Sequence, residues 1–351
     1  MKITILFHTS PRVAGGGTKV LYEYANYLAQ KRNSVEIAYM ANQLWSNFHF
    51  PEKIRRFLAL ESIKNRPTWF DLDERIVKYG VFDVNNETIH DADVIVITDV
   101  RTADPVSRLD ENKGKKIYMI QDFENWVLPD EKVYATYSLD FKHITVAKFL
   151  SNMVDAHSTS KAVCVPNGIN TDLFKVTAPI EKRKKHSIVF HYRSNPQKGS
   201  RYAFETIKIL QEKYPDLDVT VVSIEKKPSD LPRNCKFIHD ASPQEVADIN
   251  NSVSVFLCTS VIEGFGLPGL EAMACGCALV TTDYTAVHEY AENQYNALIS
   301  PVKDAESMAR NVIRLFEDDN LRMKIARNAA TTGAERSLEI SAKKFEEAIS
   351  G

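Results

Sequence analysis

Short apolar runs alternate with amphipathic stretches along most of the chain. Uninterrupted apolar runs are typical of strands that are buried on both faces of a parallel sheet. In the first half we expect strands at 3–7, 35–40, 93–98, 116–120, 144–146 and 162–165. In the second half we expect strands at 187–192, 219–223, 236–238, 253–257 and 278–282.

The stretches between these runs repeat their apolar residues at helical spacing. The first such helix should run to Gln30, with Thr18 as a plausible N-cap. Further helices are expected at 147–156, from Gly199 onward, and at 243–250, 267–274, 305–316, 319–332 and 337–349. Strands that alternate with helices in this way predict α/β architecture with parallel sheets. A chain of 351 residues is long enough for about two such domains.

Composition narrows the class of protein without identifying it. Apolar residues make up 44% and charged residues 26%, which is ordinary for a globular protein, and a net charge of −2 gives no reason to expect a nucleic-acid partner. The apolar runs are far shorter than the ~20 residues that span a bilayer, and the N-terminus shows no cleavage site. The five cysteines lack metal-ligand spacing. We therefore expect reduced cysteines, no metal site and a cytoplasmic protein.

The stretch from Thr259 to Asp283 carries the most chemical information. Glu263 and Glu271 stand eight positions apart and bracket a glycine-rich loop that follows an apolar strand. Glycines let a backbone approach a ligand closely, and Pro268 suits the first turn of a helix. A glycine loop that leads into a helix N-terminus favours an anion, and a carboxylate at Glu271 could accept hydrogen bonds from vicinal hydroxyls. The alternative is an ordinary helix start with two solvated glutamates.

The whole string closely resembles the E-x7-E motif of family 4 glycosyltransferases, which are retaining enzymes with the GT-B fold. The resemblance implies two Rossmann-like domains that face each other across a cleft. In the family the first glutamate lies by the donor sugar and the second holds the nucleotide ribose, and these roles would pass to Glu263 and Glu271. The backbone contacts to the donor would pass to Gly264, Phe265, Gly266 and Leu267.

The segment PNGINTDLF resembles the family's interdomain segment, and its Pro166-Asn167-Gly168 start has strong turn chemistry. We therefore expect an acceptor-side domain at 1–170 and a nucleotide-sugar domain at 171–336. The family resemblance further implies that 337–351 packs back on the first domain. The charge-rich residues 176–186 read as an exposed linker.

Two basic residues, Arg193 and Lys198, flank the loop before the helix at Gly199. They are either surface bases or ligands of an anion, since a helix start by itself disfavours cations. In the family, an arginine and a lysine at this spacing hold the donor diphosphate. Together with the helix start after Glu263 they would supply the charge that a metal supplies elsewhere, so we expect no divalent metal and no cofactor apart from the sugar nucleotide.

The first domain offers weaker signals. The triple glycine at 15–17 lacks the third glycine of a dinucleotide fingerprint, and no acid ends the second strand, so an NAD site is disfavoured. A glycine pair here lies against the donor phosphates in the family, and Gly16 and Gly17 match it. Many family members have a histidine-aspartate pair after the strand at 116–120, where this chain has Gln121 and Asp122. Asp122 is the candidate catalytic acid of this domain, and the alternative is that Asp122 and Glu124 simply begin a helix.

The QDFE string resembles rhamnosyltransferases of bacterial surface-polysaccharide pathways. Residues 47–64 mix aromatic and basic residues, as in a solvated helix face or in an acceptor-side patch at a membrane surface. The expected function is transfer of a hexose from a nucleoside diphosphate sugar to a glycan or lipid-linked glycan at the inner face of the membrane. Two alternatives remain: a nucleotide-sugar-binding protein without turnover, and an epimerase or hydrolase on the same fold.

Overall fold

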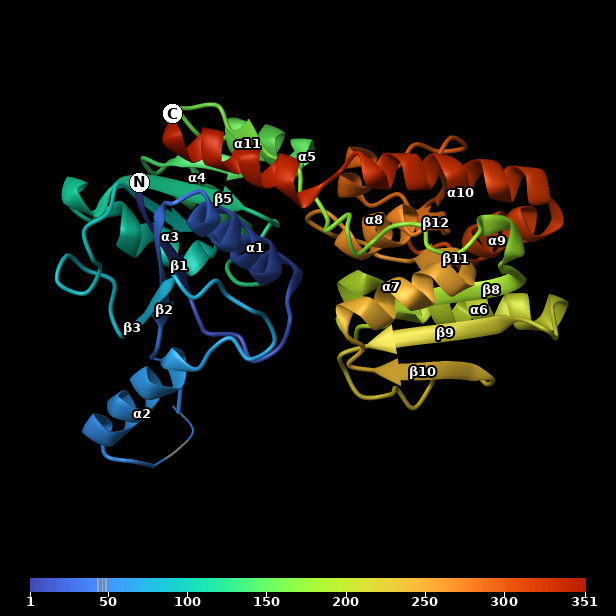
Figure 1. The fold of residues 1–351 in the computed structure, drawn as a ribbon, viewed down its shortest axis with the longest axis horizontal. Coiled ribbons are helices and arrows are strands. Elements are labelled where there is room, and N and C mark those ends of the chain that lie inside the picture. Colours follow the sequence, from blue (N-terminus) through green and yellow to red (C-terminus); the bar gives the residue numbers. More distant parts are fainter. Residues whose placement is uncertain (43, 46, 48) are drawn as a thin grey trace. The chain divides into compact units, whose positions relative to one another are not determined.

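The computed structural model describes residues 1–351 except 43, 46 and 48. Its chain divides into two units, residues 1–166 together with 339–351, and residues 167–338. The boundaries expected from the sequence, at 170 and 337, lie close to these positions. Each unit is an α/β domain with its own parallel sheet (Figure 1).

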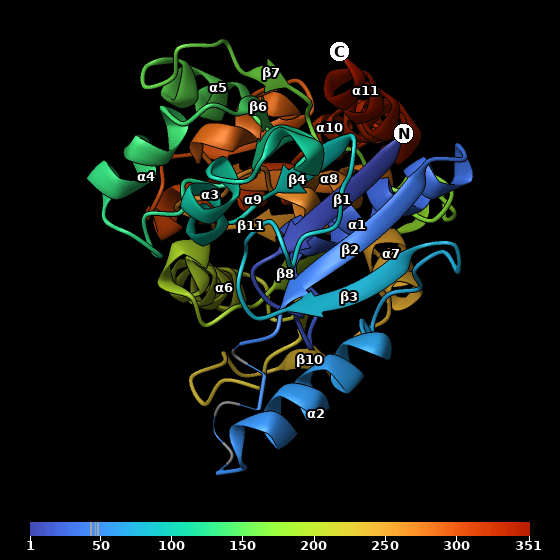
Figure 2. The same cartoon turned by 90° about the vertical axis from the view of Figure 1, so that its left-hand side faces the viewer.

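The first unit is built on a seven-stranded sheet with the order β3-β2-β1-β4-β5-β6-β7 (Figure 2). Most of its strands are the apolar runs of the sequence, which a parallel sheet covered by helices buries on both faces. The strands are β1 (Lys2–Phe7), β2 (Ser34–Met40), β3 (Val77–Val81), β4 (Val94–Ile97), β5 (Lys115–Ile120), β6 (Lys142–Thr145) and β7 (Val163–Cys164). The strand at 77–81 was not expected from the sequence, and only its last residue is buried. Helices α1 (Gly16–Gln30), α2 (Glu52–Lys64), α3 (Val100–Ser107), α4 (Asp130–Tyr137) and α5 (Lys148–Asp155) connect them.

Helix α1 begins three residues earlier than the sequence suggested. Its N-cap is Gly15, in an extended conformation, and no side chain caps the helix. The prediction of Thr18 as N-cap is therefore wrong, because the glycines before it enter the helix themselves. The amides at this helix start are left without a side-chain partner.

The last helix, α11 (Leu338–Ser350), returns to the first unit (Figure 1). Phe345 stacks on Tyr24 of α1 with ring centroids 4.8 Å apart. Asn33 donates a hydrogen bond to Glu346 at 3.2 Å. Both aromatic side chains are fully buried, so α11 completes the core of this unit.

The second unit has a six-stranded sheet with the order β10-β9-β8-β11-β12-β13. Its strands are β8 (Lys184–His191), β9 (Asp218–Ser223), β10 (Cys235–His239), β11 (Val253–Cys258), β12 (Ala278–Thr282) and β13 (Ala297–Ser300). The helices are α6 (Ser200–Lys213), α7 (Pro243–Ser252), α8 (Leu267–Ala274), α9 (Ala305–Glu317) and α10 (Asp319–Ala334). Apolar residues of β8, β9, β11 and β12 join residues of α6 and α9 in one buried core.

The charged run at 176–186 is an exposed linker only in its first part, since residues 176–182 are exposed or partly exposed, and its last part corrects the sequence interpretation. Strand β8 already begins at Lys184, and Arg183 is only 8% exposed. Its guanidinium donates to the carbonyl oxygens of Val253, at 3.2 Å, and Cys275, at 2.6 Å. Both terminal nitrogens of the buried guanidinium are hydrogen-bonded, whereas its Nε has no hydrogen-bond partner among the described residues, and the group ties the start of the unit to β11 and α8.

In both sheets the strand order reverses direction once, between β1 and β4 and between β8 and β11. Open α/β sheets bind ligands outside the carboxyl ends of the strands at such switch points. The two switch points therefore indicate where to look for a site in each unit.

Candidate functional site

The switch point of the second unit is formed by two loops that touch along their length. The loop after β8 leads into α6, and the loop after β11 leads into α8. The amide of Val261 donates to the carbonyl of Gln197 at 2.7 Å. Gly199, at φ +63°, has no room for a side chain, since a Cβ there would lie 1.9 Å from the carbonyl oxygen of Thr259. This close approach brings Lys198 and Glu263 together from positions 65 residues apart.

Glu263 is fixed by two direct contacts, one of which is supported by a third residue. The ammonium of Lys198 lies 3.4 Å from its Oε1, and the hydroxyl of Ser260 donates to the same oxygen. Thr282, at the end of β12, in turn donates to the carbonyl of Ser260. The Glu263 side chain is 14% exposed and that of Lys198 is 34% exposed. Glu263 thus acts as the counterion of Lys198, and an anionic ligand would compete with it for that ammonium.

Arg193 is the second cation of this site. Its backbone amide and carbonyl are both bonded to the hydroxyl of Ser200 at the start of α6. Among the residues that the structure describes, no carboxylate lies within ion-pair distance of its guanidinium. Burial lowers the pKa of Arg193, and the fields of Glu225 and Glu263 partly offset that effect. A partly buried guanidinium without an acid partner is costly to desolvate, and an anionic ligand would remove that cost.

The starts of α6 and α8 add backbone donors to these two cations. Gly199 and Gly266 are the N-cap residues, and neither helix has a side-chain cap. Uncapped helix starts present amide N–H groups and a partial positive charge. Helix α8 runs from Leu267 to Ala274, as the sequence predicted, with Pro268 in its first turn. The site therefore combines two cations with two helix starts, an arrangement that favours an anionic ligand.

A pair of buried tyrosines supports the glycine loop, and sequence reasoning missed both. Tyr290 donates from its hydroxyl to the carbonyl of Gly266 at 2.9 Å, and it is also hydrogen-bonded to Tyr284. A Cβ on Gly266, at φ +94°, would lie 2.2 Å from the hydroxyl of Tyr284. The tyrosines follow β12 with no motif around them, so only the fold places them here. They hold the loop in the left-handed conformation that glycine allows.

The side chains of the remaining motif residues are mostly buried. Phe265 is 4% exposed and its ring lies 5.6 Å from that of Tyr290. Phe265 is therefore a packing residue, and its backbone is the part that a ligand could contact. Glu271 is 8% exposed within α8. Gly264 and Leu267 are partly exposed at the loop and at the helix start.

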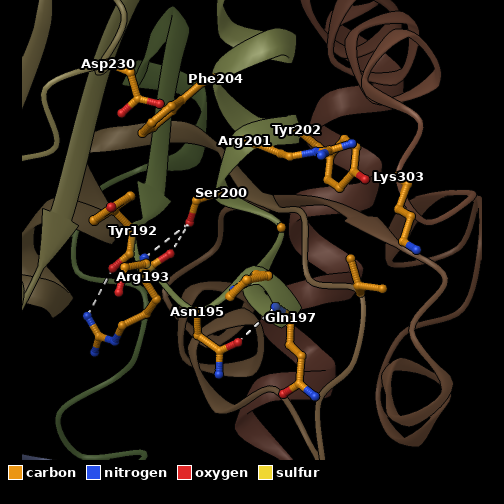
Figure 3. Close-up of a pocket in the computed structure, with 14 residues that line it drawn as sticks. Tyr192, Arg193, Asn195, Gln197, Ser200, Arg201, Tyr202, Phe204, Asp230 and Lys303 are labelled. Carbon is orange, nitrogen blue, oxygen red and sulfur yellow. Dashed lines mark hydrogen bonds between the residues drawn. The ribbon is translucent and has the colours of Figure 1, made fainter.

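A cavity of about 570 Å³ opens beside the loop that follows β8 (Figure 3). Arg193 belongs to its lining, whereas Lys198, Glu263 and Glu271 do not. The close-up shows Tyr192 near Phe204, and their rings are stacked 5.8 Å apart. The labelled residues around the cavity are Tyr192, Arg193, Asn195, Gln197, Ser200, Arg201, Tyr202, Phe204, Asp230 and Lys303.

The remaining candidates lie at the switch point of the first unit. Gly16 and Gly17 form the first turn of α1. A Cβ on Gly17 would lie 3.1 Å from Nε2 of Gln121, and that amide donates to the Gly17 carbonyl and to the Thr98 hydroxyl. Asp122 is partly buried, and its Oδ1 accepts a hydrogen bond from the amide of Phe123 at 2.9 Å. The structure thus groups Gly16, Gly17 and Asp122 in one unit and Glu263, Glu271, Arg193 and Lys198 in the other.

Two further properties concern metals and membranes. The described residues contain no group of three or more His, Cys, Asp or Glu side chains that could hold a metal ion. Among the helices of residues 1–42, 44–45, 47 and 49–351, none is long and apolar enough to cross a membrane.

Residues 174–332 match the family described as "Glycosyl transferases group 1". The match covers almost the whole second unit, including Arg193, Lys198 and the two glutamates of the motif.

Two curated relatives share part of the sequence. A phosphatidyl-myo-inositol mannosyltransferase of Mycolicibacterium smegmatis is 28% identical over 46% of this chain and 45% of its own length. An N,N'-diacetylbacillosaminyl-diphospho-undecaprenol alpha-1,3-N-acetylgalactosaminyltransferase of Campylobacter jejuni is 31% identical over 29% of this chain and 27% of its own length. The chain thus spans half or less of the length of these relatives.

Solved structures match along the whole chain. The Anabaena HepE protein in complex with UDP gives a TM-score of 0.77 at 16% identity, and all of both chains is covered. Sucrose-phosphate synthase from Thermosynechococcus elongatus gives a TM-score of 0.76 at 14% identity, covering 99% of this chain and 97% of its own. These matches confirm the fold class predicted from the sequence, GT-B with two Rossmann-like α/β domains.

Proposed function

We propose that the protein is a retaining family 4 glycosyltransferase that moves a hexosyl group from a nucleoside diphosphate sugar to a glycan or lipid-linked glycan. The observation that carries the proposal is the positive site of the second unit, where Arg193, Lys198 and two uncapped helix starts converge. A diphosphate leaving group needs stabilisation of this kind, in a fixed arrangement. The match of residues 174–332 to the group 1 glycosyl transferases supports the same reading.

The relatives agree with this class of donor and acceptor. One is named as a mannosyltransferase and one acts on a diphospho-undecaprenol acceptor. The HepE protein has been seen with UDP-glucose. We propose a hexosyl donor for this chain. The QDFE string is the reason for proposing a rhamnosyl donor in particular.

In the proposed reaction the bond between the anomeric carbon and the diphosphate oxygen breaks, and the diphosphate leaves with the electron pair. Arg193, Lys198 and the amides of 264–267 stabilise the departing charge. The acceptor oxygen bonds to the anomeric carbon on the face that the diphosphate leaves, and its proton passes to the diphosphate. Glu263 lies beside the donor sugar, and Glu271 accepts hydrogen bonds from the ribose hydroxyls. Gly16 and Gly17 contribute backbone contacts to the donor phosphates, and Asp122 is the catalytic candidate of the first unit.

The decisive experiment measures release of nucleoside diphosphate from UDP-, GDP- and dTDP-hexoses, with and without added glycan acceptors. A thermal-shift screen selects the donor first, because a ligand of the folded state raises the melting temperature. Release that depends on the acceptor, with an α-configured donor giving an α-linked product, supports a retaining transferase. Release or isomerisation without acceptor indicates a hydrolase or an epimerase, and binding without any turnover indicates a binding protein.

We further propose a peripheral membrane contact through α2. Ile54 is 48% and Phe57 is 63% exposed on this helix, with Phe50 at 44% just before it. Exposed Lys53 and Lys64 accompany these apolar side chains, and that combination suits an interface with anionic lipid. Phe48, part of the same aromatic stretch, lies outside the described residues.

Flotation with vesicles of neutral and of anionic phospholipid tests this contact. Phe57→Ser should reduce binding to anionic vesicles, whereas Val302→Ser, which replaces an exposed apolar side chain of the second unit, should not. Equal flotation of both variants and the unmodified protein would remove α2 from the membrane.

A further inference from the structure

The switch point of the first unit contains a carboxyl group that the reaction described above does not use. Strands β1, β4 and β5 are neighbours in the sheet. Their carboxyl ends place His8, Asp99 and the segment after Gln121 at one edge. Ligands of open α/β sheets bind at this position. The group in question is Glu124, four residues after the end of β5.

Glu124 lies against the start of α3 without a cation of its own. Its Oε2 accepts a hydrogen bond from the amide of Val100 at 2.7 Å. The nearest cation, Arg101, is engaged by Asp99, whose Oδ1 lies 2.8 Å from the Arg101 Nε. No ion pair within the described part of the chain includes Glu124. Two carboxyl groups therefore lie near one guanidinium, and only Asp99 forms an ion pair with it.

The two acids consequently differ in charge. Burial raises the pKa of Glu124 to about 8, and the negative charges of Asp99 and Asp122 also raise it. The hydrogen bond from the Val100 amide and the charge of Arg101 lower the pKa, but by less. Burial also acts to raise the pKa of Asp99, but the hydrogen bonds from Arg101 outweigh it and lower that pKa. Two carboxyl groups whose environments separate their pKa values take different roles. At neutral pH Asp99 is ionised, and Glu124 is largely a carboxylic acid that can donate a hydrogen bond.

The other groups that face Glu124 do not supply a compensating charge. Tyr118, on β5, and Tyr137, on α4, interact electrostatically with Glu124, and burial raises the pKa of both phenols. They remain neutral in the physiological range. His8 faces Asp99 and Arg101, and burial lowers its pKa. The groups on β5, α3 and α4 that face Glu124 thus favour its neutral form.

An exposed aromatic ring lies in the same turn. The amide of Val127 donates to the carbonyl of Glu124 at 2.9 Å and closes the turn that contains Trp126. The Trp126 side chain is 61% exposed. A single exposed apolar side chain is common on protein surfaces, so what singles out Trp126 is its place in the turn that contains Glu124. Its flat face suits the apolar C–H face of a sugar ring, whose hydroxyls need hydrogen-bonding partners.

We propose that Glu124 and Trp126 form a sugar-binding subsite in the first unit, in which the Glu124 carboxylic acid donates a hydrogen bond to a ligand hydroxyl oxygen and Trp126 packs on the ring. The assignment of that sugar as the acceptor rests on the proposed function. Glu124 would then be a specificity residue for the acceptor, while donor binding stays with the second unit.

The first test needs no turnover. Methyl glucoside, mannoside, galactoside and rhamnoside are mixed with the protein, and saturation-transfer NMR detects which of them binds and with what Kd. Glu124→Ala and Trp126→Ala should each weaken the best probe about tenfold or more, the effect of a lost hydrogen bond or of lost ring contact. Glu131→Gln, which changes an exposed glutamate on α4, is the matched control and should bind as the unmodified protein does.

The proton state is tested with Glu124→Gln, because an amide keeps one acceptor and one donor but cannot ionise. This variant should bind the probe within about threefold of the unmodified protein at pH 7. Between pH 7 and 9 the unmodified protein should lose about tenfold in affinity as Glu124 loses its proton, whereas Glu124→Gln should keep its affinity.

The proposal is overturned if no methyl glycoside binds, if Glu124→Ala binds as the unmodified protein does, or if Glu124→Gln is as weak as Glu124→Ala. Failure of the proposed function has a different signature. In that case the sugar still binds in a Glu124-dependent manner, but no nucleoside diphosphate is released from any donor when it is present.

Discussion

Replacing Glu124 by glutamine should make the first unit more stable at alkaline pH. The pKa of Glu124 is about 8 in the folded protein and 4.5 for an ordinary glutamate. Between those values the folded state holds a proton that the unfolded chain releases, so stability falls as the pH rises from 4.5 to 8. Glutamine does not titrate, and the difference between the two proteins therefore isolates this one group.

The size of the effect follows from the same two values. Each pH unit corresponds to about 1.36 kcal/mol, which gives roughly 5 kcal/mol as an upper bound for the whole interval. Relaxation and water entry around the ionised group reduce such penalties. We expect Glu124→Gln to gain about 2–4 kcal/mol in unfolding free energy, relative to the unmodified protein, between pH 5 and pH 8.5.

Urea unfolding followed by tryptophan fluorescence is the appropriate assay. All three tryptophans, Trp45, Trp69 and Trp126, belong to the first unit, so the signal reports that unit separately. Glu131→Gln serves as the control and should show no such pH dependence. A difference between Glu124→Gln and the unmodified protein that stays constant from pH 5 to pH 8.5 would refute the reasoning about burial.

Three further predictions concern the second unit. Glu271→Gln should weaken nucleoside diphosphate binding in calorimetry by roughly 1.5–3 kcal/mol, the range for a hydrogen bond to a charged group; equal affinities would remove Glu271 from the ribose. Gly199→Ala should lower the free energy of unfolding by about 3 kcal/mol or more, since its Cβ would lie 1.9 Å from the Thr259 carbonyl oxygen. Gly16→Ala is the control and should change the free energy of unfolding by less than about 1 kcal/mol, because no atom lies within 4 Å of its Cβ. Lys198→Ala should slow turnover about a hundredfold while excess EDTA leaves the unmodified enzyme active, and an activity that EDTA abolishes and magnesium restores would contradict the role given to the cations.

Short sequence motifs predicted those helices, strands and turns whose conformation is determined by residues close together in the chain. The strand, glycine loop and helix around Glu263 were readable because Pro268 and the glycines specify their own backbone conformations. The N-cap of α1 was misplaced since a run of glycines carries no side chain that marks the start. The apolar runs marked most of the parallel strands for the same local reason, but β3 and β13 were missed. Two Rossmann-like domains follow from the alternation of these strands with helices.

Contacts between distant segments could not be read in the same way. Arg183 lies in a run of charges that suggests solvent, and its burial is explained by acceptors from distant segments, among them the carbonyls of Val253 and Cys275. The pairing of Lys198 with Glu263 requires β8 and β11 to be neighbours. The altered pKa of Glu124 likewise requires the end of β5 to meet the start of α3. In each case the sheet order, which no short motif encodes, decides the chemistry.

The claim that the second unit binds the donor diphosphate through fixed cations is tested most directly by calorimetry with Arg193→Gln. The nucleoside diphosphate with the largest thermal shift is titrated into this variant, into the unmodified protein and into Arg310→Gln, which changes an exposed arginine on α9. The account predicts at least about tenfold weaker binding for Arg193→Gln and nearly unchanged binding for Arg310→Gln. Equal affinity in all three proteins would contradict it.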